Sequence, residues 1–523
     1  MVGISLIIGI LMGISLSVPS VSNKSTVSQS HTKKLLDIFE VIDNQYVDSV
    51  DKTELLEETI ADMLHRLDPH SNYIPASELQ RMSESIQGHF GGIGVRFTIL
   101  NDTLNITHVV PNSPAQKSGI QVFDQFIRVE KDTIANIGLR NSKVQELLKG
   151  EVGTTVNVTV LRNNEIIEKS IRRGVVPINS VLASYMMDQQ TGYIRLSQFS
   201  MQTDREFMEA ARDLQRRGMN RLILDLRHNS GGVMGAATSI LDEFLEKGKR
   251  IVSTKSKNGI EMIEESRRNP SLGDIDLIVL INQGSASASE IVAGAIQDND
   301  RGVIVGRRSF GKGLVQQDIE LKDGSNLRLT TSRYYTPSGR SIQRPYTGDY
   351  EEYVREEFSR YENGELYQVD SSIFVDSLKH YTLKGRVVYG GGGIMPDVFT
   401  PLDTAGSSSF FRHLQYANAF ADYAYIFARS GELNKYQQLE GFANRFRISD
   451  ALLNDFLNYA SEKAGIMKNK PDLKHSKERI KVELKAEIAR QKWLENGSMY
   501  ILNQHDSEVQ KALETFAKMK DFI

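Results

Sequence analysis

A repeated alternation of strand and helix patterns in the middle of the chain constrains the fold most. Three short apolar runs, "GYIRL", "LILDLR" and "LIVLIN", are followed in turn by the helical patterns "DREFMEAARDLQRRG", "GAATSILDEFLEKG" and "SASEIVAGAIQD". Strands that alternate with helices in this way form a sheet that is covered by those helices. We therefore predict an α/β core over residues 175–401.

The regions on either side of this core have a different texture. Residues 86–174 contain short β-branched runs separated by Gly and Asn, which is typical of a small β-rich domain. Residues 23–85 and 402–523 carry apolar side chains at helical spacing. The chain is also too long for one core. The predicted fold is thus an α/β core with an inserted β-rich domain and helical N-terminal and C-terminal extensions.

The first residues predict export. "MVGISLIIGILMGISLSVPS" has no charge and is apolar from Val2 to about Val18. That stretch is long for the core of a signal peptide and borderline for a membrane span of about 20 residues. We assign residues 1–22 to a signal or a single membrane anchor, and the sequence leaves cleavage and retention equally open.

Composition and missing motifs exclude several classes of function. The net charge of −3 gives no reason to expect nucleic acid or an anionic membrane surface as a partner. The absence of cysteine excludes disulfides, thiolate metal sites and a cysteine nucleophile. Neither HExxH nor GxxxxGK[ST] occurs, so neither a metal nor another cofactor is implied.

The stretch "GSASASE" places three serines between a predicted buried strand and a helix. A hydroxyl at this position is exposed and lies beside free N–H groups of the helix terminus, which suits a nucleophile. Helix capping explains one serine but not three. Lys312 follows the next strand in the turn "SFGKG", and burial could lower its pKa enough for it to act as a base. His228, in "LDLRHNSGG", is the alternative base.

The segment "GSASASEIVAGAIQDNDRGVIVGRRSFGKGLVQ" resembles the catalytic segment of the carboxyl-terminal processing peptidases, or tail-specific proteases. The resemblance implies a serine endopeptidase with a Ser-Lys dyad whose members lie 25 positions apart. Here 312 − 287 = 25, which assigns Ser287 as the nucleophile and Lys312 as the base. Gln316 occupies the place of the family's glutamine, which orients the lysine.

The same resemblance implies an oxyanion hole. Ala288, after the nucleophile, would give one N–H, and Gly231 or Gly232 in "LILDLRHNSGG" would give the other. "LDPHSNYI", "YYTPSGRSIQ" and "GGGIMPDV" also resemble landmarks of the family. The acidic insert "GDYEEYVREEFSRYENGELYQVD" and the helical tail depart from the family's pattern, at places that concern substrate access and oligomer geometry.

The β-rich region begins with "GHFGGIGVRFTI", whose glycines offer consecutive unhindered N–H groups for an anion. A strand edge beside them could accept an extended peptide. This stretch resembles the carboxylate-binding loop of PDZ domains, so we expect Gly91, Gly92, Ile93 and Gly94 to bind a peptide C-terminus. Ile93 and Val95 are expected to favour nonpolar tails.

Together these features predict an exported enzyme of the bacterial periplasm or cell envelope. An anchor in the inner membrane is left open, and the N-terminal segment is the one expected contact with a membrane. The partners of this enzyme would be proteins with nonpolar C-terminal tails. A homodimer is expected by analogy with relatives that assemble through helical extensions, and an adaptor protein is left open. The alternative is a PDZ-bearing scaffold or adaptor whose protease core is inactive.

Overall fold

The computed structural model describes residues 29–369, 375–463, 465–467 and 470–523. It divides into two compact units, Met1–Met63 and Leu64–Ile523. The first unit contributes α2 (Gln29–Gln45) and most of α3 (Lys52–His65). The predicted export segment lies outside the described residues. In the part that is described, no helix is both long and apolar enough to cross a membrane.

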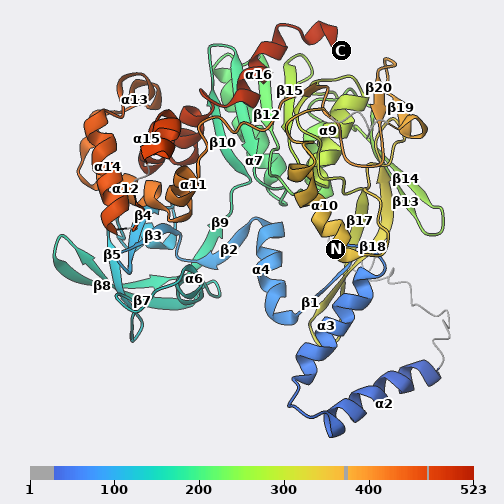
Figure 1. Ribbon diagram of the computed structural model, residues 1–523, viewed down its shortest axis with the longest axis horizontal. Coiled ribbons are helices and arrows are strands. Elements are labelled where there is room, and N and C mark those ends of the chain that lie inside the picture. Colours follow the sequence, from blue (N-terminus) through green and yellow to red (C-terminus); the bar gives the residue numbers. More distant parts are fainter. Residues whose placement is uncertain (1–28, 370–374, 464, 468–469) are drawn as a thin grey trace, which may run out of the picture. The chain divides into compact units, whose positions relative to one another are not determined.

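A six-stranded sheet forms the centre of the second unit (Figure 1). Its spatial order is β10–β11–β12–β15–β16–β21, with one antiparallel pair, β10–β11, and parallel pairing between all other neighbours. The strands are β10 (Val181–Met186), β11 (Thr191–Leu196), β12 (Arg221–Asp225), β15 (Asp276–Ile281), β16 (Val303–Gly306) and β21 (Val398–Phe399). The predicted α/β core is confirmed.

Helices cover both faces of this sheet. Helices α7 (Thr203–Arg216), α8 (Met234–Leu241) and α9 (Ala288–Asp298) share one buried cluster with the sheet. On the other face, α16 (Ser507–Phe516) buries Val509 and Phe516 against side chains of the central strands. Residues near the C-terminus therefore return to the α/β core and cover part of its second face.

Ion pairs fix the start of α16 at the edge of the sheet. Arg227, which follows β12, contacts Asp506 at 2.8 Å, and Arg307, which follows β16, contacts Glu508 at 2.6 Å. Both arginine side chains are buried, so each charge needs such a partner.

A second, antiparallel sheet lies beside the core and is built around β18 (Asn326–Tyr335). Its other strands are β1 (Asn72–Ile74), β13 (Arg250–Ser256), β14 (Glu261–Glu265) and β17 (Leu314–Glu320). After β18 come α10 (Tyr350–Glu362), η2 (Asp376–Leu378) and a hairpin of β19 (Lys379–Tyr381) and β20 (Val387–Tyr389). The acidic insert thus begins with a helix, α10.

The β-rich domain is joined to the core through a two-stranded sheet of β2 (His89–Gly92) and β9 (Gly174–Pro177). Helix α4 (Ala76–Gln87) precedes it. The main sheet of this domain has the order β3–β4–β5–β7–β8, so β3 lies at an edge. Its elements are β3 (Val95–Leu100), β4 (Thr103–Val109), α5 (Pro114–Lys117), β5 (Gln125–Val129), β6 (Asp132–Thr133), α6 (Asn141–Leu148), β7 (Thr155–Arg162) and β8 (Glu165–Arg172).

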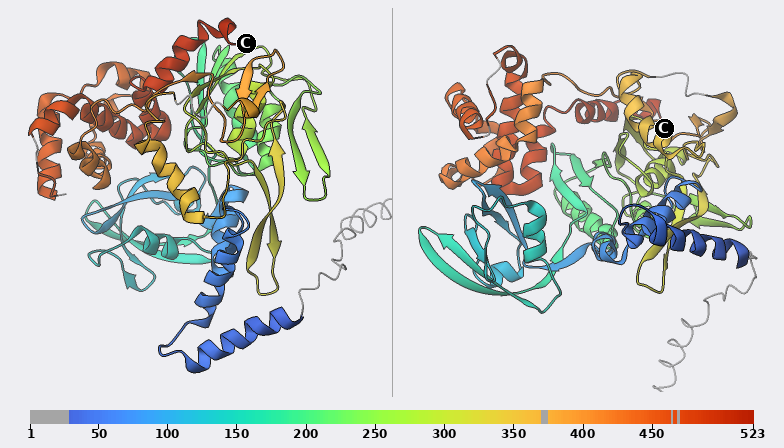
Figure 2. Two further views of the ribbon diagram at one scale, coloured as in Figure 1. Left: turned by 45° about the vertical axis from the view of Figure 1, so that its right-hand side comes forward. Right: turned by 60° about the horizontal axis from the view of Figure 1, so that its bottom comes forward.

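The helices after the core pack beside the β-rich domain (Figure 2). They form an aromatic cluster of their own, in which the Phe420 and Phe456 rings stack at 5.0 Å. Thr98 on β3 donates a hydrogen bond to Asp422. These elements are α11 (Ser409–Tyr416), α12 (Ala419–Arg429), η3 (Glu432–Lys435), α13 (Leu439–Arg445), α14 (Asp450–Lys463), α15 (Lys470–Leu502, kinked at Leu494) and, after α16, η4 (Met519–Asp521).

The packing of α16 predicts that Phe516→Ala destabilises the core. Phe516 is 7% exposed, so its removal leaves a cavity that we expect to lower the free energy of unfolding by about 3 kcal/mol. Phe358→Ala is the control, because that ring is 66% exposed and should cost less than about 0.5 kcal/mol. Urea denaturation measures both, and equal values for the two variants would show that α16 is not part of the core.

Candidate active site

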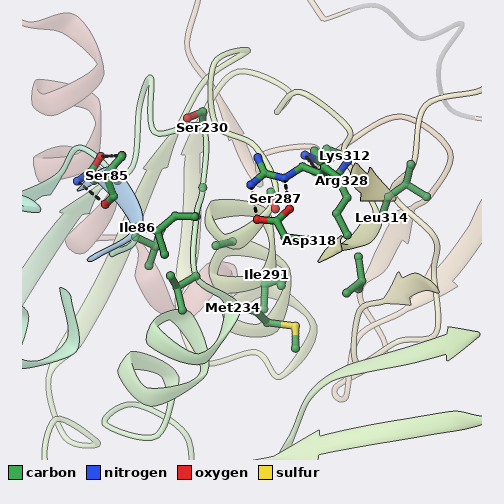
Figure 3. A pocket seen from close by; sticks show the side chains of 18 of the residues that line it. Ser85, Ile86, Ser230, Met234, Ser287, Ile291, Lys312, Leu314, Asp318 and Arg328 are labelled. Atoms are coloured by element: carbon green, nitrogen blue, oxygen red, sulfur yellow. Dashed lines mark hydrogen bonds and ion pairs between the residues drawn. The ribbon is translucent and has the colours of Figure 1, made fainter. Parts of the chain in front are cut away.

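A cavity of about 510 Å³ brings together segments that are far apart in the sequence (Figure 3). Ser287 and Ala288 enter it from the start of α9, and Lys312 and Gln316 from the turn before β17 and from β17 itself. The loop after β12 adds Gly231 and Gly232. The structure therefore gathers all the residues that the sequence assigned to catalysis and to the oxyanion hole around one space.

The three serines of the turn differ in what they do. The Ser285 hydroxyl donates to the carbonyl of Leu226 at 2.9 Å, and the Ser289 hydroxyl donates to the carbonyl of Asn229 at 2.8 Å. Of the three, Ser287 lines the cavity. Its backbone has φ 53° and ψ −113°, a conformation that is strained for a residue with a side chain. Two serines thus hold the turn, and the middle one is presented to the cavity.

The carboxylate of Glu290 joins the serine turn to the lysine turn. One oxygen accepts hydrogen bonds from the N–H groups of Ser287 at 2.8 Å and Lys312 at 2.9 Å. The other accepts from the Ser309 hydroxyl at 2.5 Å and the Gly311 N–H at 2.7 Å. Glu290 is completely buried, so burial raises its pKa while these four donors oppose that shift. Sequence reasoning missed this residue, although it lies within the quoted serine motif.

Lys312 is half-buried, and its amine donates a hydrogen bond to Gln316 Oε1 at 2.7 Å. Burial lowers the pKa of Lys312, and the nearby guanidinium of Arg328 lowers it further. The carboxylates of Asp68 and Glu290 oppose this effect. The net direction favours the neutral amine, which is the form that can accept a proton.

Two residues that line the cavity, Ala288 and Gly232, have backbone N–H groups that could bind an anion. Gly231 donates its N–H to Asn229 Oδ1 at 2.9 Å, whereas within the described part of the chain the N–H groups of Ala288 and Gly232 have no hydrogen-bond acceptor. Glycine is needed at 231, because an added Cβ would lie 2.7 Å from the Ala286 carbonyl oxygen. The close approach of the two loops therefore depends on this glycine.

His228 does not line this cavity. It borders a separate cavity of about 550 Å³, and its Nε2 lies 2.8 Å from the side-chain nitrogen of Asn282. Burial lowers its pKa. The loop after β12 thus places Gly231 and Gly232 at the cavity that contains Ser287, and His228 at a separate cavity.

The four residues expected to bind a peptide C-terminus do not form a single loop. Gly91 and Gly92 belong to β2 and pair with β9, whereas Ile93 and Gly94 form the turn that leads into the edge strand β3. The expectation that the Ile93 side chain contacts nonpolar tails is wrong, because it is 2% exposed and packs in the core of the β-rich domain. Val95 is half-buried.

Other contributors to the cavity carried no sequence signal of their own. Asp318 and Arg328 form a two-fold ion pair beside Lys312, with contacts of 2.7 and 2.8 Å. Helix α4 adds Met82 and Ile86 to the cavity wall. In the described residues no group of His, Asp or Glu side chains is arranged to hold a metal ion.

Comparisons with protein-family models match four parts of the chain. The model of peptidase family S41 matches residues 190–351, and that of the PDZ domain matches residues 91–172. The N-terminal domain of the activating protease CtpB matches residues 14–77. A family of unknown function (DUF8443) matches residues 410–494.

Curated relatives are similar over most of their length. A carboxy-terminal-processing protease of Bartonella bacilliformis is 38% identical over 348 residues, which are 64% of this chain and 78% of the relative. A probable CtpA-like serine protease of Staphylococcus aureus is 31% identical over 62% of this chain and 64% of the relative. Among solved structures, a photosystem II D1 C-terminal processing protease is 25% identical over 71% of this chain and 93% of its own, with a TM-score of 0.37.

The position of Arg328 predicts a change in the pH profile of activity. Because its positive charge lowers the pKa of Lys312, Arg328→Gln should raise that pKa and move the rising limb of the profile to higher pH. At a fixed pH on that limb, the activity of Arg328→Gln should be about threefold lower than that of the wild type. Arg333→Gln on the same strand is the control, because Arg333 is exposed and is not among the charges that shift Lys312. A profile of Arg328→Gln that coincides with the wild type would contradict this account.

Proposed function

Because this chain belongs to the carboxyl-terminal processing peptidases of family S41, which are serine-type peptidases, we propose that it cleaves protein tails with a dyad of Ser287 and Lys312. The observation that supports the dyad most strongly is the shared carboxylate of Glu290, which binds the N–H groups of both residues. Both side chains also line one cavity that is large enough for an extended peptide segment.

In the proposed acylation, the neutral amine of Lys312 removes the hydroxyl proton as Ser287 Oγ attacks the carbonyl carbon of the scissile peptide. The N–H groups of Ala288 and Gly232 stabilise the oxyanion, because both residues line the cavity with Ser287 and neither N–H has another acceptor within the described structure. Protonated Lys312 then gives its proton to the leaving amine, and the C–N bond breaks.

Deacylation uses the same groups. Lys312, neutral again, takes a proton from water as the water oxygen attacks the acyl-enzyme. The tetrahedral oxyanion returns to the same N–H groups, and collapse releases the carboxylic acid product, which then loses its proton to solvent. Ser287 Oγ leaves with the proton held by Lys312, which restores both residues. Throughout both steps, Gln316 Oε1 accepts a hydrogen bond from one N–H of the Lys312 amine. The lone pair on the Lys312 nitrogen is therefore directed away from Gln316.

Recognition of the tail is assigned to the PDZ domain. We assign the N–H groups of Ile93 and Gly94 to the terminal carboxylate, and the free edge of β3 to the extended chain that precedes it. Since Ile93 is buried, preference for nonpolar tails would depend on other side chains near this edge, such as Val95. Export to the bacterial cell envelope, a homodimer and an adaptor remain predictions from the sequence.

The dyad predicts two inactive variants with different chemistry. Ser287→Ala removes the nucleophile, and Lys312→Arg replaces the base with a group that stays protonated. Each should lower kcat by at least about 10³-fold on a quenched fluorescent peptide that ends in Ala-Val-Ala. Lys255→Arg is the matched control, because Lys255 is exposed on β13 and should keep full activity. Binding of the same peptide, measured by anisotropy, should stay unchanged in all three variants.

A Ser287→Ala variant that cleaves like the wild type would disprove the assignment of the nucleophile. A wild-type protein that binds the peptide without cleaving it would instead favour the scaffold function.

The proposed tail site predicts that the terminal carboxylate matters. Amidation of the peptide C-terminus removes the negative charge that the two N–H groups would bind. We expect KM to rise about 10-fold or more, because hydrogen bonds to charged groups contribute about 1.5–3 kcal/mol. The control is the free-acid peptide of the same sequence, and equal KM values would contradict recognition of a chain end.

A further inference from the structure

The helix of the acidic insert reaches the proposed catalytic lysine through a series of contacts. Tyr353 on α10 has its hydroxyl 3.0 Å from His70 Nε2. The backbone carbonyl of His70 accepts a hydrogen bond from Gln316 Nε2. Gln316 Oε1 in turn accepts from the Lys312 amine at 2.7 Å. These contacts connect four residues from three separate parts of the chain.

The carbonyl of His70 decides which way the Gln316 amide faces. A carbonyl can only accept a hydrogen bond, so the NH₂ end of the amide must point toward His70 and the oxygen toward Lys312. In that orientation the amide takes one N–H of the neutral amine and leaves the lone pair for the proton of Ser287. A reversed amide would donate to the lone pair and block the base. The position of His70 therefore affects the chemistry without contacting the substrate.

The segment that carries His70 is fixed to the sheet that carries Gln316. Asp68 accepts hydrogen bonds from the N–H groups of His70 at 2.9 Å and Ser71 at 2.8 Å. It also accepts from the hydroxyl of Thr330 on β18 at 3.0 Å, and β18 is the partner strand of β17. Burial and the nearby Lys312 lower the pKa of His70 to about 3, so its ring is neutral near pH 7. In the neutral tautomer that is protonated at Nδ1, His70 Nε2 accepts a hydrogen bond from the Tyr353 hydroxyl.

Other side chains contact both the ring and the hydroxyl of Tyr353. The guanidinium of Arg344 lies between the rings of Phe310 and Tyr353, 4.2 and 4.1 Å from their centres. Gln343 donates to the Tyr353 hydroxyl at 3.4 Å, and its Oε1 accepts from the N–H of Gly313, next to Lys312, at 2.8 Å. The Tyr353 oxygen thus accepts a hydrogen bond from Gln343, while its own O–H can donate to His70 Nε2.

We propose that Tyr353 and His70 are positioning residues for the Ser-Lys dyad, and that the acidic insert contributes to catalysis through Tyr353. This assignment rests on the proposed function. Helix α10 is built into the protein near this point: the Tyr350 ring stacks on His65 at 3.9 Å, and Glu356 contacts Arg308 at 3.2 Å. The insert therefore reaches the lysine through Tyr353 and His70, which do not line the cavity around Ser287.

The test is Tyr353→Phe, which keeps the ring against Arg344 and removes only the hydroxyl. We expect kcat on the quenched peptide to fall about 5- to 10-fold, with KM within about twofold of the wild type and Tm within about 2 °C. Tyr350→Phe is the matched control on the same helix and should keep the wild-type kcat. Tyr353→Ala, which also removes the ring, should lower both kcat and Tm.

A double-mutant cycle with Gln316→Ala separates positioning from a general structural effect. If Tyr353 acts through Gln316, Tyr353→Phe should lower kcat by less than about twofold in the Gln316→Ala background. A full 5- to 10-fold loss in that background, or a wild-type kcat for Tyr353→Phe alone, would overturn the assignment. Wild-type protein that fails to cleave the peptide, or Ser287→Ala that still cleaves it, would contradict the proposed function itself and this assignment with it.

Discussion

The buried carboxylate of Glu290 is the interaction on which the site depends. It lies in the first turn of α9 and binds both the turn that presents Ser287 and the turn that presents Lys312. A buried carboxylate is costly unless its oxygens are satisfied, and here each oxygen has two donors. The two turns can therefore donate all four hydrogen bonds to Glu290 only when they lie side by side. The same hydrogen bonds hold Ser287 in its strained conformation.

The sheet explains why these turns meet at all. Parallel strands β12, β15 and β16 end at the same edge, and the loops after them carry the glycines, the serine and the lysine. Ligand and catalytic sites in open α/β sheets occur at this edge because the loops converge there. The second sheet then adds Gln316 and Arg328 from β17 and β18. Catalysis would thus use the α/β core for the nucleophile and the antiparallel sheet for tuning the base.

The α/β core and the position of Ser287 could be predicted because both leave local patterns. The strand–helix alternation is a periodic signal, and the spacing of Ser287 and Lys312 follows a family resemblance. The role of Glu290 could not be predicted in the same way, since it depends on hydrogen bonds between turns about 20 residues apart. The His70 carbonyl has no side-chain signature at all. Ile93 was misplaced because a turn before a strand does not show which apolar side chain faces the core.

The proposed dyad requires that the amine of Lys312 lies in a site that favours its neutral form. The most direct measurement is the pKa of Lys312 in the intact protein, followed by NMR of lysine labelled with ¹³C at Cε and assigned with the Lys312→Arg variant. We expect a midpoint below the ordinary lysine value of about 10.4, because burial and Arg328 both disfavour the charged amine. A midpoint at or above that value would contradict it.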